Sequence, residues 1–219
     1  MHKNCSARDT CLCKTHANFS FIFEKLRQHE IVTEKNASSF VKNVVCDVNS
    51  KECMFGECLN CKNRSIFREY PAEHLTFYYL WVTEKVVRPG AKKLDYTVQI
   101  TSRKTIECSY ADLVEACKKM LPNYLKHCFI TRHQFQALQE IKDNLKRDEI
   151  LINLDFSQNY SCKYGSEIQS IHFGASKRQV TLHTGGFYYR DQNEEVSFQS
   201  FATFSDCLNH EASAVWAHL

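Results

Sequence analysis

The distribution of cysteine is the feature that most constrains this chain. Seven of its twelve cysteines lie before residue 62, and the other five are spread singly over the rest of the 219 residues. Closely spaced cysteines are typical of a disulfide framework in a secreted protein or of a metal site in a reducing compartment. The N-terminus, Met-His-Lys-Asn-Cys, lacks the apolar core of a signal peptide. The pattern therefore favours metal binding and predicts an intracellular protein, nuclear or cytoplasmic.

One observation favours a secreted protein instead. Five Asn-x-Ser tripeptides fit the glycosylation sequon, at Asn4, Asn18, Asn36, Asn63 and Asn159. Such tripeptides arise often by chance, and no export signal accompanies them. No run of residues approaches the ~18 continuous apolar positions of a membrane span, so we expect no membrane contact.

Two pairs of metal ligands have a spacing that lets one short loop present both side chains to one ion. They are Cys13-x2-His16 and Cys58-x2-Cys61. Zinc takes four such ligands in a tetrahedron. We predict a zinc-binding Cys/His module within residues 11–61, with the two pairs converging on one ion.

Further cysteines flank both pairs. Cys46 and Cys53 are included among the predicted zinc ligands, and Cys11 lies beside the first pair. These thiols leave open a second ion or a different pairing. A structural site is favoured over a catalytic one, because thiolate-rich sites close the coordination sphere of zinc. We expect the remaining cysteines to be buried free thiols: Cys108, Cys117, Cys128, Cys162 and Cys207.

The pattern of apolar residues predicts an α+β fold in three parts. These are a zinc-binding Cys/His module over 1–70, a β-hairpin plus helical connecting region over 71–148, and a strand-rich part over 149–219. Helices are predicted around 19–26, 38–45, 109–120 and 124–146, with a break or kink at Pro122. Strands are predicted over 75–84, 96–101, 149–155, 179–189 and 196–204, followed by a helix after Asp206 laid across one face of the sheet.

The middle of the chain carries an excess of positive charge. Residues 62–107 hold nine Lys or Arg against five Asp or Glu, whereas the whole chain has a net charge of only +3. An excess of this kind suits contact with a phosphate backbone. It is equally compatible with a solvated basic surface.

Asp155 ends a short apolar strand, where a carboxylate needs either a metal ion or hydrogen-bonding partners. Four sequence motifs in this part of the chain form a recognisable set: Asp155-Phe-Ser-Gln-Asn-Tyr160, Glu167-Ile-Gln-Ser-Ile-His-Phe-Gly174, Thr181-Leu-His-Thr-Gly185 and Ser205-Asp-x3-His210. This set resembles transposon-derived, DDE-type transposase-like proteins of invertebrates. The upstream Cys/His cluster is similar to theirs as well, so the resemblance covers most of the chain.

The resemblance implies a zinc module, a helical linker and the first half of a ribonuclease H-like mixed α/β core. It implies DNA as partner and strand cleavage and transfer by two divalent ions, magnesium or manganese, held by carboxylates. Asp155 is then the first catalytic acid. The two later acids are expected beyond Leu219, while Asp206 suits a cap or turn. We therefore expect a fragment that does not cut DNA.

Two other functions remain open. The chain is alternatively a non-catalytic, zinc-stabilised adaptor that contacts nucleic acid or protein through residues 62–107, or a purely structural protein. The oligomeric state and the DNA target do not follow from the sequence.

Overall fold

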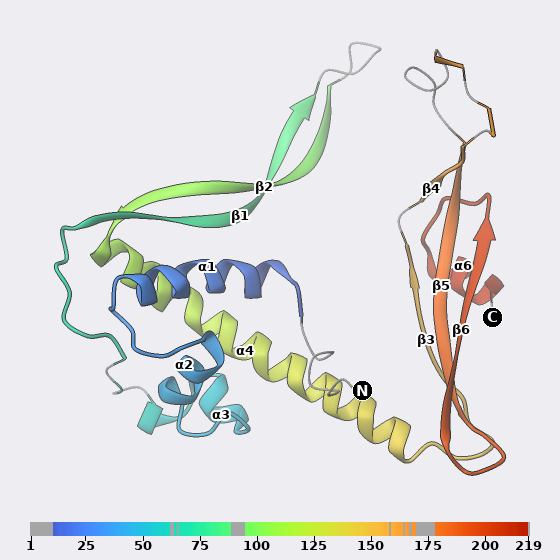
Figure 1. Ribbon diagram of the computed structural model, residues 1–219, viewed down its shortest axis with the longest axis horizontal. Helices are drawn as coiled ribbons and strands as arrows, with labels where there is room; N and C mark the ends of the chain where they lie inside the picture. The colour runs from blue at the N-terminus through green and yellow to red at the C-terminus, as the bar shows by residue number, and fades with distance from the viewer. Residues whose placement is uncertain are drawn as a thin grey trace. The chain divides into compact units, whose positions relative to one another are not determined.

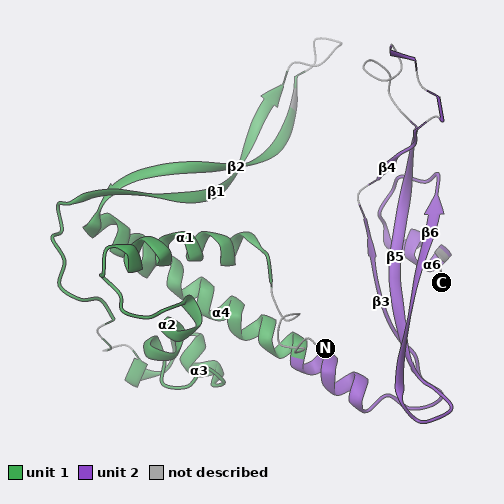
Figure 2. Cartoon of the chain, in the orientation of Figure 1, with its two compact units in different colours: residues 1–135 green, residues 136–219 purple. Residues whose placement is uncertain are grey.

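The computed structural model describes residues 11–61, 64, 66–88, 95–157, 159–163, 165–166, 168–169 and 178–218. The chain forms two compact units, residues 1–135 and 136–219, with the boundary inside one long helix (Figures 1 and 2). The fold is α+β. The division into 1–70, 71–148 and 149–219 stays a prediction. Within the described ranges, no helix is long and apolar enough to cross a membrane.

The first unit combines short helices with one β-hairpin. In chain order it contains α1 (Lys14–Gln28), α2 (Ala37–Val44), α3 (Lys51–Met54), the 3-10 helix η2 (Leu59–Cys61), β1 (Leu75–Arg88), β2 (Tyr96–Ser109) and α4 (Tyr110–Asp143). A capping box forms at the start of α4. Ser109 Oγ accepts from the backbone N–H of Asp112, and the Asp112 carboxylate accepts from that of Ser109.

The core of this unit lies between α1, α2 and α4. Helix α1 buries Phe19, Ile22, Phe23 and Leu26, which recur at helical spacing on one face. Phe19 stacks on Tyr124 of α4, with 3.8 Å between ring centroids. Each fully buried side chain of this size contributes about 1.5–3 kcal/mol, so this core fixes α1 against α4.

Helix α4 runs for 34 residues with Pro122 inside it. Of the two alternatives expected at Pro122, a break or a kink, the break is therefore absent. The buried neighbours Leu121, Tyr124 and Leu125 hold both sides of the proline against the core. Tertiary packing therefore outweighs the loss of one backbone hydrogen bond.

Strands β1 and β2 form a long antiparallel hairpin, paired from Leu75↔Ser109 to Arg88↔Tyr96. Helix α1 lies along the inner half of β1. The Asn18 side chain accepts a hydrogen bond from the backbone N–H of Trp81 (2.7 Å) and donates one to the Trp81 carbonyl (3.0 Å). These two bonds occupy the edge of β1 that does not pair with β2. Residues 83–88 are all exposed, so the outer half of the hairpin is an arm (Figure 1).

The second unit contains an antiparallel sheet. It consists of β3 (Leu151–Phe156), β4 (Tyr160–Ser161), β5 (Gln179–Arg190) and β6 (Val196–Ser205), and α6 (Ala212–His218) follows. β5 pairs with each of the other three strands. The predicted three neighbouring strands over 149–205 are confirmed, with β4 as a short addition.

The segment that leads into α6 covers one end of this sheet. His210 stacks on Phe156 with ring centroids 4.5 Å apart. The hydroxyl of buried Thr181 donates to the carbonyl of Cys207 at 2.7 Å. Trp216 of α6 is 76% exposed, so this apolar side chain is poorly covered.

Candidate metal centres

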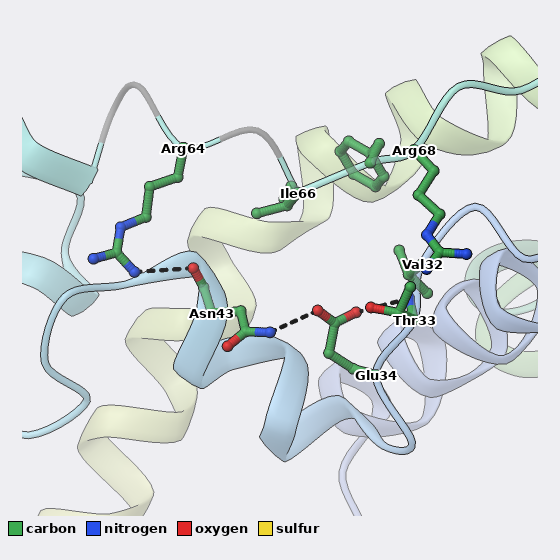
Figure 3. A pocket seen from close by; sticks show the side chains of 8 residues that line it. Val32, Thr33, Glu34, Asn43, Arg64, Ile66 and Arg68 are labelled. Atoms are coloured by element: carbon green, nitrogen blue, oxygen red, sulfur yellow. Dashed lines mark hydrogen bonds between the residues drawn. The ribbon is translucent and has the colours of Figure 1, made fainter.

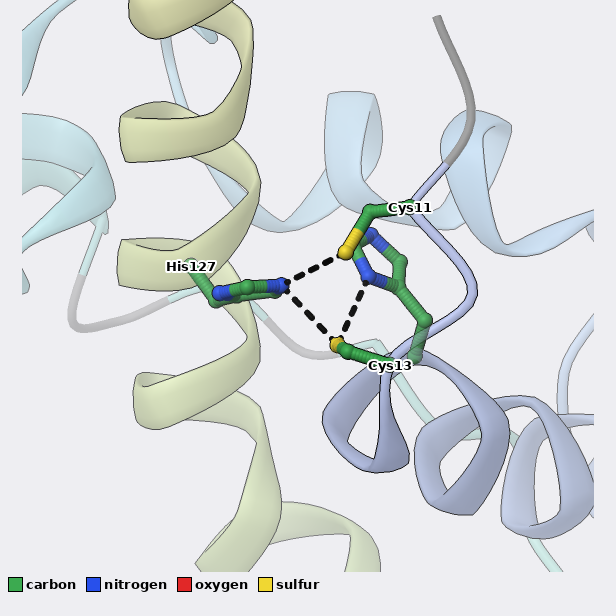
Figure 4. Close-up of side chains that lie close together, drawn as sticks. Cys11, Cys13 and His127 are labelled. Carbon is green, nitrogen blue, oxygen red and sulfur yellow. Dashed lines mark hydrogen bonds between the residues drawn. The ribbon is translucent and has the colours of Figure 1, made fainter. Parts of the chain in front are cut away.

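Four side chains from two distant parts of the chain form the first metal cluster. Cys11 and Cys13 directly precede α1, His16 lies in its first turn, and His127 projects from α4 (Figure 4). One ligand atom from each residue lies within 4.8 Å of all the others. All four residues are half-buried.

The distances within this cluster suit a tetrahedral ion. Cys13 Sγ lies 3.1 Å from His127 Nε2 and 3.4 Å from His16 Nδ1, and Cys11 Sγ lies 3.5 Å from His127 Nε2. With Zn–S of ~2.3 Å and Zn–N of ~2.05 Å, a tetrahedron separates sulfur from nitrogen by about 3.6 Å. The first cluster therefore needs little adjustment to close on a metal ion.

The local electrostatics favour the ligand forms of these side chains. Burial, and then the neighbouring His127, lower the pKa of His16, so its imidazole stays neutral and keeps a lone pair. Burial opposes ionisation of Cys13. Hydrogen bonds from the backbone of His16, from the Cys11 side chain and from Thr15 outweigh it and lower the Cys13 pKa.

Four cysteines form the second metal cluster. Cys46 follows α2, Cys53 lies in α3, Cys58 follows that helix, and Cys61 ends η2. The sulfurs of Cys46 and Cys61 are 3.4 Å apart, against about 3.8 Å between two sulfurs on a zinc ion. Gly56, at φ +78°, turns the chain between the second and third ligands in a conformation that other residues rarely adopt.

Hydrogen bonds and burial shift the pKa values of two thiols in the second cluster. The backbone N–H of Cys61, followed by its side chain, lowers the pKa of Cys58 to about 7. Burial raises the pKa of Cys61 to about 12. Cys58 therefore ionises at lower pH than Cys61. The backbone N–H of Cys46 donates to Cys61 Sγ at 3.3 Å.

Arg64 connects the second cluster to a surface groove. Its guanidinium donates to the carbonyls of Asn43 (3.0 Å) and Val45 (3.1 Å) and to Cys46 Sγ (3.4 Å). The groove has a volume of about 430 Å³, and Arg64 and Arg68 project into it from one side (Figure 3). Glu34 lies opposite and accepts from the Asn43 amide.

The position of Arg64 would suit a metal ion bound in the second cluster. A divalent ion with two thiolates and two neutral imidazoles carries no net charge, whereas a divalent ion with four thiolates carries −2. A nearby guanidinium offsets part of that charge and donates to a ligand sulfur. The first cluster needs no such partner, and its ligands are embedded between two helices.

The predicted ligands are all found in the clusters, but not in the predicted pairing. Cys13 and His16 belong to the first cluster, and Cys46, Cys53, Cys58 and Cys61 make up the second. The expectation that the Cys13/His16 and Cys58/Cys61 pairs converge on one ion is therefore wrong. The α1–α4 packing brings His127 to the first pair, while the loop between α2 and η2 supplies its own four thiols. The alternative of a second ion with a different pairing fits the geometry.

His127 and Cys11 complete the first cluster, and His127 was not predicted. No local pattern marks it, because it lies 114 residues from Cys13. The other cysteines follow the prediction only in part. Cys117 is buried and Cys108, Cys128 and Cys162 are half-buried, but Cys207 is exposed. The described cysteines form no disulfide.

Asp155 lies on β3, opposite Thr184 of β5, and is exposed. Among the described strands β3 pairs only with β5, so its other edge is open. Asp206 forms an ion pair with Arg178 at 2.7 Å. No described cluster of metal-binding side chains includes Asp155 or Asp206. Glu167 and His172, from the motif quoted over 167–174, lie outside the described residues.

Comparison with known proteins finds one similarity. Residues 134–219 match a family model described as a domain of unknown function, DUF8701. No curated protein and no solved structure matches the chain. The matched range includes the whole sheet of the second unit and none of the eight residues of the metal clusters.

Proposed function

We propose that the first unit is a two-zinc module that binds DNA. The observation that carries this proposal is the pair of closed four-ligand clusters. Thiolate and imidazole ligands suit zinc among the common biological ions. Four protein ligands leave no open position for a substrate or water, so the ions have a structural role.

The hairpin arm is the proposed DNA contact. A two-stranded β-ribbon fits the major groove of B-DNA. The arm carries Lys85 and Arg88 on β1, both exposed, and Arg103 is exposed further along β2. Helix α1 holds the base of the arm through Asn18, and the first cluster lies at the beginning of the same helix. Zinc in that cluster would therefore orient the arm.

The second unit fits the start of a ribonuclease H-like core. The three strands β3, β5 and β6 form an antiparallel meander followed by a helix. This order supports the transposase-like interpretation, in which Asp155 is the first catalytic acid and DNA is the substrate. Since two-metal cleavage needs several carboxylates around the ions, we propose that this chain does not cut DNA. Magnesium or manganese would belong only to a complete catalytic domain.

The test is DNA binding by the zinc-loaded chain, measured by fluorescence anisotropy over a range of salt concentrations. For wild type we expect an affinity that falls as salt rises. Replacing Lys85 and Arg88 together by Ala should reduce the magnitude of the log–log slope by about 1.8 if both contact phosphates. Gln99→Ala, directly opposite Lys85 on the arm, is the neutral control and should leave the slope unchanged.

Two results would contradict the DNA proposal. One is no binding at low salt by the zinc-loaded chain, and the other is binding that is the same in the double variant and the control. Either result, with zinc still present, would favour the non-catalytic adaptor that contacts a protein.

A further inference from the structure

We infer that Cys128 is a positioning residue of the first metal cluster, whose sulfur accepts a hydrogen bond from His16 Nε2 and so directs Nδ1 to the ion. This inference rests on the proposed binding of zinc in that cluster. It gives a role to a cysteine that the sequence marks only as a buried free thiol.

The two nitrogens of His16 face different sulfurs. Nδ1 lies 3.4 Å from the ligand Cys13, and Nε2 lies 3.7 Å from Cys128 Sγ. A neutral imidazole has one N–H and one lone pair. When Nδ1 gives its lone pair to the ion, the hydrogen must be on Nε2, which places it toward Cys128.

Helix α4 surrounds the His16 ring with three residues of one face. Tyr124, His127 and Cys128 are at positions i, i+3 and i+4, which lie together on a helix surface. The Tyr124 and His127 rings make edge contacts with His16, at centroid distances of 5.5 and 4.8 Å. α4 thus supplies one metal ligand and, in the next residue, the partner of another ligand.

The expected consequence is a loss of metal affinity with the fold retained. A histidine ligand in a metal site ordinarily donates its second N–H to a fixed acceptor, and removal of such an acceptor weakens binding by about 10–100-fold. Cys128→Ala removes the acceptor, whereas Cys128→Ser keeps a smaller one and should recover part of the affinity. Cys117→Ala removes a fully buried thiol of the same helix that belongs to neither cluster and is the matched control.

The experiment is a zinc titration of the full chain against a competing chelator, followed by NMR of the imidazole nitrogens. Histidine signals report on the first cluster alone, because the second has no histidine. In zinc-loaded wild type we expect His16 to be coordinated through Nδ1, with a slowly exchanging proton on Nε2. In Cys128→Ala this proton should exchange quickly and the first cluster should bind zinc about 10–100-fold more weakly, while zinc in the second cluster is unaffected.

Coordination of His16 through Nε2 in wild type would overturn the inference. So would equal zinc affinity of Cys128→Ala and Cys117→Ala. A failure of the underlying proposal looks different, because wild type itself would then show no change in its histidine signals when zinc is added.

Discussion

Replacing His127 by Gln should remove zinc from the first cluster and leave the second intact. Of the four described residues in this cluster, His127 alone lies outside residues 11–16, so a metal ion bound there would join the beginning of α1 to α4. Structural zinc binding in small peptides is worth about 10–16 kcal/mol, or roughly 2.5–4 kcal/mol for each of four ligands. Loss of one ligand therefore weakens affinity by about 10²–10³-fold.

This loss converts into a measurable change in stability. With free zinc buffered at 100 times the wild-type Kd, binding stabilises the folded state by about 2.7 kcal/mol. A variant with a Kd ~100-fold higher gains only about 0.4 kcal/mol at the same free zinc. The zinc-dependent increment for this cluster should thus fall by about 2.3 kcal/mol, while the stabilities in chelator should be similar.

Urea unfolding in zinc buffers is the assay, followed by fluorescence of Trp81 in a Trp216→Phe background. These are the two tryptophans of the chain, so the remaining signal reports on the first unit. His133→Gln is the control, because His133 lies on α4, is exposed and contacts Phe129 rather than the cluster. If His127→Gln kept the full zinc increment, the assignment of His127 as a ligand would be wrong.

Three further predictions follow from the same geometry. Arg64→Ala should lower zinc affinity of the second cluster by about 10-fold or more in chelator competition, and unchanged affinity would show that its hydrogen bond to Cys46 has no effect on the metal. Gly186→Val should destabilise the second unit by about 1–3 kcal/mol in thermal unfolding, because a Cβ there would lie 2.2 Å from the Phe198 ring; an unchanged Tm would refute that packing. Zinc-loaded chain and Asp155→Ala should be equally inactive in a magnesium- or manganese-dependent nuclease assay, and cleavage lost on substitution would contradict the proposal that this chain does not cut DNA.

The parts of the site that depend on local spacing were predictable. Cys13 and His16 lie on adjacent positions around one helix start, and Cys58 and Cys61 on one tight turn, so the sequence alone marks both pairs. The grouping of the ligands was not predictable in this way, because Cys46 and Cys53 were predicted as ligands without being assigned to the second pair, and His127 was not predicted. His127 reaches Cys13 only because Phe19 stacks on Tyr124 one helical turn before His127.

The same distinction between local pattern and tertiary packing applies to the prediction of the fold. A short apolar run identified β3, and the change to a strand pattern identified β5 and β6, because both signals are local properties of the sequence. The continuation of α4 through Pro122 depends on burial of its neighbours against α1 and α2, which no local rule contains. The length of both hairpin strands was underestimated, since β1 continues past residue 84 to Arg88 and β2 past residue 101 to Ser109.

The most direct test of the two-zinc account is native mass spectrometry of the full chain, purified under reducing conditions, combined with X-ray absorption at the zinc edge. The account predicts two zinc ions per chain. Six sulfur and two nitrogen ligands over the two sites average to three sulfurs and one nitrogen per ion, with Zn–S near ~2.3 Å. A single ion per chain, or an average of two sulfurs and two nitrogens, would contradict it.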